Sequence, residues 1–281
     1  GGGVLTVAGD VTIEDSTINY NGSNRAGGGI EVIVGSVDIT NTDLLNNFTA
    51  TSGMGNGPGN GGGLHTTGDG GSTLTEVTIS GGTVDGNVAA EEGGGLWNAS
   101  GSTLNIYGTD ITNNAANGTG ADQGGGGVFN NGGSVYIGGA TISGNVANYG
   151  SGSGGGVLTT DGDLTIVDSD ITNNDANRAG GGIEVITGDV DIDGVFLSGN
   201  TTGFGSGSPG NGGGLHVTGD AEVDIFDSTI TENLAAEEGG GLWNSATGTM
   251  TVDTTGVYGN TASGDGADQG GGGIFNNGGT L

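Results

Sequence analysis

Cysteine is absent from this 281-residue chain, and basic residues are almost absent, with only Arg25 and Arg178 present. Without cysteine the chain has no disulfide scaffold and no zinc–thiolate site. The 32 acidic residues give a formal net charge of −30. Such a charge repels phosphate backbones and anionic lipids, so we expect no nucleic-acid partner and favour cations or neutral surfaces. No apolar run approaches the roughly 18 residues of a membrane-spanning helix, so we expect no membrane span in this segment.

Glycine, in contrast, is abundant, with 72 residues. A composition of this kind usually indicates disorder when the glycines have no period, but here three glycines followed by an aliphatic residue recur ten times. The spacing is 26 residues from Val4 to Ile30 and 34 residues from Ile30 to Leu64. Periodic glycines therefore predict a repeat architecture. The ten aliphatic residues are Val4, Ile30, Leu64, Leu96, Val128, Val157, Ile183, Leu215, Leu242 and Ile274.

A second pattern lies between consecutive glycine triplets: aliphatic, any residue, aliphatic, four residues, aliphatic, two residues, asparagine. Its first copy is Val11, Ile13, Ile18 and Asn21. Alternation with a period of two predicts short strands. The five-residue step from Ile13 to Ile18 leaves room for a corner and no hairpin. The nine asparagines are Asn21, Asn47, Asn87, Asn114, Asn145, Asn174, Asn200, Asn233 and Asn260.

Together the two patterns predict an all-β parallel β-helix (β-solenoid) of about ten coils with 26 to 34 residues per coil. Each coil is expected to supply three short strands that pair with their equivalents above and below at about 4.8 Å. The asparagines are expected to form an inward ladder at one corner, because stacked amides bond each other and the backbone groups that a bend leaves unpaired.

A longer period is superposed on the coils. From Val4 to Val157 is 153 residues, from Val128 to Ile274 is 146 residues, and the phrase NRAGGGIEVI occurs in both halves. We expect a single continuous β-helix over 1–281, built from two tandem five-coil units at about 1–153 and 154–281. We also expect the chain to be an excerpt of a longer repetitive protein.

These repeats resemble those of right-handed parallel β-helices, and among them the polymorphic outer-membrane-type adhesins and similar bacterial surface proteins. The resemblance implies a right-handed helix and an extracellular or cell-surface location. It implies little about activity, because polysaccharide lyases, glycoside hydrolases and tailspikes share this scaffold. The lyases are similar in requiring a basic residue near the abstracted proton, and the two arginines of this chain occupy equivalent places in its two units.

Residues directly after the glycine-led aliphatics are expected to point outward. This column contains aromatic residues and histidines that would stack on sugar rings or contact a protein if they were exposed. The alternative is that neighbouring long loops, such as 49–60 and 201–211, cover them. Glu31 is expected to form a local charge pair with His65. The candidate contact strip is His65, Trp97, Phe129, His216, Trp243 and Phe275.

Outward carboxylates at Asp38, Asp43, Asp191 and Asp224 are the candidates for a calcium site, because adjacent rungs bring oxygen ligands together. The alternative is a solvated acidic face. We expect no resident cofactor, with calcium as the open alternative.

The sequence favours a non-enzymatic rod: an adhesin stalk, a surface-layer component or a filament. Its expected partners are further copies, end to end or lateral, a neutral glycan or a surface protein. No catalytic residue is predicted. The alternatives are a carbohydrate-active β-helix, a glycan-binding module and an ice-binding array of outward threonines.

Overall fold

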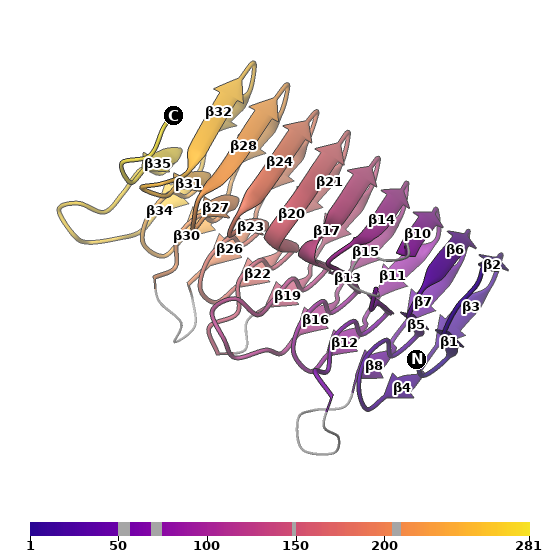
Figure 1. Ribbon diagram of the computed structural model, residues 1–281. Coiled ribbons are helices and arrows are strands. Elements are labelled where there is room, and N and C mark those ends of the chain that lie inside the picture. Colours follow the sequence, from indigo (N-terminus) through magenta and orange to yellow (C-terminus); the bar gives the residue numbers. More distant parts are fainter. Residues whose placement is uncertain (50–56, 69–74, 148–149, 204–208) are drawn as a thin grey trace.

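The computed structural model describes residues 1–49, 57–68, 75–147, 150–203 and 209–281. In these ranges the chain is all β, and its parallel strands form three sheets stacked as a β-solenoid of about nine turns (Figure 1). The predicted parallel β-helix is therefore confirmed. Among the described residues no helix is long and apolar enough to cross a membrane.

In the part of the chain that the structure describes, the largest sheet has 17 strands in two columns. The first column follows the glycine triplets: β1 (Val4–Thr6), β5 (Ile30–Val32), β9 (Leu64–Thr66), β13 (Leu96–Ala99), β23 (Ile183–Val185), β27 (Leu215–Val217), β31 (Leu242–Asn244) and β35 (Ile274–Asn276). The second column is β2 (Val11–Glu14), β6 (Gly35–Thr40), β10 (Thr75–Ser80), β14 (Ser102–Tyr107), β24 (Gly188–Asp193), β28 (Ala221–Phe226) and β32 (Thr249–Asp253). Two long strands, β17 (Val128–Gly138) and β20 (Val157–Val167), run through both columns and join them.

The second and third sheets have nine strands each among the described residues. The second sheet is β3 (Thr17–Asn19), β7 (Asp43–Leu45), β11 (Thr83–Asp85), β15 (Asp110–Thr112), β18 (Thr141–Ser143), β21 (Asp170–Thr172), β25 (Phe196–Ser198), β29 (Thr229–Thr231) and β33 (Gly256–Tyr258). The third is β4 (Gly22–Ser23), β8 (Phe48–Thr49), β12 (Val88–Ala89), β16 (Ala115–Ala116), β19 (Val146–Ala147), β22 (Asp175–Ala176), β26 (Thr201–Thr202), β30 (Leu234–Ala235) and β34 (Thr261–Ala262).

Aliphatic side chains fill the interior in continuous columns. Ile79 pairs in register with Ile106, and Ile106 with Ile137, on three successive turns. All three are fully buried. Because equivalent residues stack directly, one hydrophobic core runs the length of the solenoid.

The asparagine ladder is confirmed along its whole length. Each side chain from Asn21 to Asn233 donates Nδ2 to the Oδ1 of the next asparagine, at distances of 2.9 to 3.1 Å. Asn145 is typical: it also donates to Ile111 O at 2.9 Å and accepts from the backbone N–H of Asn114 at 3.0 Å. The amides thus satisfy backbone groups that the corner leaves unpaired.

The first glycine of each triplet reverses the chain just before the first-column strand. Gly93 has φ of 65°, a conformation that favours glycine. A Cβ on Gly93 would lie 2.8 Å from Trp97 Cβ, and one on Gly61 would lie 2.7 Å from His65 Cβ. The segment before each triplet is therefore folded back against the residue that follows the aliphatic.

Candidate functional site

The predicted contact strip forms a stack, but it is buried. His65 stacks on Trp97 with ring centroids 4.3 Å apart, and Trp97 on Phe129 at 6.1 Å. In the second unit His216, Trp243 and Phe275 repeat these distances. Five of the six side chains are at most 8% exposed, and Phe275 is half-buried. Trp97 and Phe129 belong to a cluster separate from the main core, as expected for residues on the outer side of the strands. Of the two alternatives, their burial contradicts an exposed contact strip and agrees with a covered one.

The reversal at the glycine triplet supplies the cover. Glu92, directly before Gly93, accepts a hydrogen bond from Trp97 Nε1 at 3.1 Å and one from Asn60 Nδ2 at 3.1 Å. In the second unit Trp243 Nε1 donates to Glu238 at 2.9 Å. Residues 50–56 and 204–208 of the two long loops lie outside the described residues.

Burial raises the pKa of Glu92 above its usual value, and the hydrogen bond from Trp97 opposes that rise. An acidic side chain is tolerated here because the indole and the amide of Asn60 satisfy it.

Buried charged groups continue the same column in the second unit. Glu184 is fully buried, and its carboxylate is hydrogen bonded to His216 Nδ1 at 2.9 Å. The hydroxyl of Thr218 donates a second hydrogen bond to it. Arg178 Nη1 lies 3.9 Å from the same carboxylate. In the first unit Arg25 Nη1 lies 4.0 Å from Glu31, and His65 Nδ1 contacts Thr67 Oγ1 at 3.4 Å. Both glutamate–histidine positions are neighbours in register, but only the second pair is hydrogen bonded through its side chains in the described structure.

The burial of His65 predicts a pH dependence of stability. Burial lowers the pKa of His65 from 6.5 to about 3, and the positive charges of Arg25 and the N-terminal ammonium contribute to this shift. Between these values the unfolded chain binds a proton that the folded chain does not. This contribution to stability is therefore complete above about pH 6.5 and is lost as the pH falls toward 3.

We expect His65→Phe to flatten this dependence. From pH 6.5 to 5 the free energy of unfolding of the unmodified chain is expected to fall by about 2 kcal/mol more than that of the variant. Urea titrations at each pH measure the difference. Glu92, whose pKa is also shifted, is present in both proteins, so its contribution cancels in the comparison. An NMR titration in which the His65 ring protonates near pH 6 would contradict the prediction.

The structure places the calcium candidates in different surroundings. Asp191 and Asp224 are partners in register on adjacent strands of the large sheet, whereas Asp38 pairs with Thr12 and Thr78. Asp43 lies on the second sheet opposite Thr17. No group of three or more potential metal-ligating side chains was found in the described ranges. Calcium binding remains a prediction.

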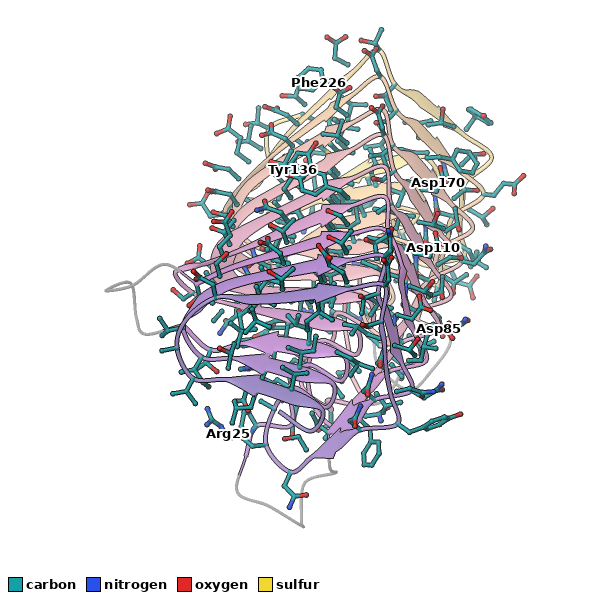
Figure 2. All side chains as sticks on the ribbon, turned by 90° about the vertical axis from the view of Figure 1, so that its right-hand side faces the viewer. Arg25, Asp85, Asp110, Tyr136, Asp170 and Phe226 are labelled. Atoms are coloured by element: carbon teal, nitrogen blue, oxygen red, sulfur yellow. The ribbon has the colours of Figure 1, made fainter. Side chains whose placement is uncertain are left out.

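The outer face of the second column changes character along the solenoid. Strands β24 and β28 present Asp189, Asp191, Glu222 and Asp224. Strands β14 and β17 instead present hydroxyls, amides and two tyrosines. Figure 2 shows Tyr136 and Phe226 on this face, with Asp85, Asp110 and Asp170 on the side of the second sheet.

Tyr107 and Tyr136 form a pair on this face that the sequence analysis did not single out. Their ring centroids lie 5.3 Å apart with an interplanar angle of 40°. A Cβ on Gly138 would lie 2.8 Å from the Tyr136 ring, so the absence of a side chain there lets the ring rest over the strand. Tyr107 is 44% exposed.

A surface cavity of about 270 Å³ lies on the same three turns. It occurs where the two columns meet, and three strands contribute to it. Its residues are Gly101, Ser102, Thr103, Gly132, Gly133, Ser134, Gly162 and Asp163. Ser102 is 2% exposed, and its Oγ has no hydrogen-bond partner in the structure.

One sequence signal could have indicated this region: the long repeat is broken there. With the 146-residue offset, Tyr107 corresponds to Asp253. Tyr107 thus departs from the duplication, whereas the aromatic residues Trp97 and Phe129 recur as Trp243 and Phe275.

Comparison with known proteins gave no match to a protein-family model, a curated protein or a solved structure.

Proposed function

We propose that this chain is a non-enzymatic structural rod at the cell surface or outside the cell, serving as an adhesin stalk, a surface-layer component or a segment of a filament. The observation that supports the proposal best is the asparagine ladder. It runs from Asn21 to Asn260 without a missing bond, so every turn is tied to the next by side chains as well as by backbone.

This arrangement suits a mechanical role. The backbone bonds between parallel strands and the amide bonds of the ladder both point along the stacking direction. A load on the rod is therefore shared by several bonds at each turn. Nine turns at about 4.8 Å extend about 43 Å, and further five-coil units would lengthen the rod without a new type of contact.

The acidic surface supports the same proposal. With a net charge of −30, rods repel each other sideways at low salt, so lateral contacts would need screening or cations.

Pulling the chain by its two ends in an optical trap tests the mechanical proposal. We expect unfolding in steps of one or a few coils, each releasing the 26 residues from Val4 to Ile30 or the 34 from Ile30 to Leu64, about 9 to 12 nm per coil. Electron microscopy of native material is expected to show rods or fibres on the cell surface. Isolated particles that depolymerise a glycan would contradict the proposal and favour a carbohydrate-active β-helix.

A further inference from the structure

We propose that the cavity between the two columns and the Tyr107–Tyr136 pair form one binding site for a neutral oligosaccharide. This site is different from the buried aromatic strip, and it goes beyond the structural role proposed above. Three observations carry it: the shape and lining of the cavity, the two tyrosines on the neighbouring part of the same strands, and the acidic surroundings, which disfavour an anionic ligand.

Glycines and hydrogen-bonding groups line the cavity. Gly101, Gly132 and Gly162 have φ of 74°, 83° and 86°, so the hollow is built into the backbone where the strands bend. Thr103, Ser134 and Asp163 stand in register on successive turns at its edge. Hydroxyls both donate and accept, and a carboxylate accepts, which matches the alternating hydroxyl groups of a sugar.

The tyrosine pair supplies the apolar part of the site. The Tyr136 ring rests over Gly138, and Tyr107 lies beside it with 44% of its surface exposed. Exposed aromatic rings give large contact areas at a low cost in conformational entropy. Their faces suit the C–H faces of sugar rings, while the phenol groups remain available for hydrogen bonds.

The dimensions define the length of the ligand. From Ser134 to Gly138 is four residues, about 13 Å along a strand. The cavity of about 270 Å³ is smaller than the roughly 300 to 1,000 Å³ of pockets for drug-sized ligands. One sugar ring therefore enters the cavity, and two or more lie over Asn105, Tyr136 and Thr165 toward the tyrosines.

Charge decides between neutral and charged ligands. Asp163 borders the cavity, Asp189 and Asp191 stand on the next strand, β24, and the whole chain carries −30. An anionic glycan would be repelled. A second copy of this chain would bring the same charge, so a neutral oligosaccharide is the favoured occupant of the aromatic surface.

The test uses the full chain and three neutral trisaccharides as probes: cellotriose, maltotriose and chitotriose, with trigalacturonic acid as the anionic counterpart. We expect at least one neutral probe to bind saturably at millimolar concentration or below in isothermal titration calorimetry, and to shift the NMR signals of Tyr107 and Tyr136. Trigalacturonic acid is expected not to bind.

Two variants locate the site. Tyr136→Ala removes one ring of the tyrosine pair, and Ser134→Trp fills the cavity. Each variant is expected to weaken binding at least tenfold. The matched control is Phe226→Ala, an aromatic residue on the same face beyond the site, which should leave affinity unchanged. Circular dichroism verifies that each variant remains folded.

The proposal is overturned if none of the neutral trisaccharides binds, if trigalacturonic acid binds as well as they do, or if Phe226→Ala weakens binding as much as Tyr136→Ala. Loss of binding would leave the step pattern in the optical trap unchanged, so this inference and the structural proposal fail separately.

Discussion

Replacing Asn145 by alanine is expected to lower the free energy of unfolding by about 3 to 5 kcal/mol. Asn145 lies in the middle of the ladder and is fully buried. The substitution leaves three groups without their partner: the backbone N–H and side-chain amide of Asn114, and the carbonyl of Ile111. It also removes the donor to Asn174 Oδ1. Each unsatisfied buried group costs about 1 to 3 kcal/mol, and water is excluded from the corner.

Urea denaturation followed by far-ultraviolet circular dichroism measures the effect. The matched control is Asn21→Ala at the first turn. Asn21 is half-exposed, and its side chain donates to Asn47 Oδ1 at 3.1 Å without receiving a bond from an earlier turn. We expect the control to lose about 1 kcal/mol. Equal losses at the two positions would mean that the ladder does not depend on burial, and would contradict the prediction.

The ladder could be predicted from the sequence because its geometry is local. The distance from Ile18 to Asn21 is the same in every coil, so one strand-and-corner conformation places all nine amides alike. Parallel stacking then follows from the repeat, because identical coils bury their aliphatic residues best on each other.

The burial of the aromatic strip could not be predicted, because the strand pattern does not determine the geometry of its cover. Alternation along β13 correctly separates Leu96 from Trp97, but a strand pattern does not reveal what lies over its outer face. The cover depends on Gly93, whose positive φ turns Glu92 back over the indole. Glycine triplets indicate a turn but not its direction, so the burial of Trp97 could not be predicted from the sequence.

The cavity could not be predicted from the sequence either, because it depends on several coils at once. Its lining comes from three coils, and it exists because β17 and β20 bend without breaking, with a register shift between Asn131 and Ser134. A glycine such as Gly132 or Gly162 then removes the side chain that would fill the bend. Neither the shift nor the alignment of these glycines can be read from one coil alone.

Replacing His216 by phenylalanine is expected to lower the free energy of unfolding by about 3 kcal/mol, because it removes the side chain that pairs with Glu184 and leaves the buried carboxyl group behind. Glu184 would remain fully buried with only the hydroxyl of Thr218 and Arg178, whose Nη1 is 3.9 Å away, to compensate it. His65→Phe is the matched control. His65 contacts Thr67 and is not hydrogen bonded to Glu31 in the described structure, so a smaller loss is expected at pH 7.

The double variant His216→Phe with Glu184→Leu distinguishes pairing from packing. Leu158 precedes this position in the column and Trp243 follows it, so an apolar pair continues the stack on both sides. We expect the second substitution to recover most of the stability lost in the first, because replacing both partners of a buried pair by apolar groups is often neutral or stabilising. Thermal and urea unfolding of the four proteins completes a double-mutant cycle. Additive losses would show that the two side chains act by shape alone, and the buried pair would then have no electrostatic role in the column.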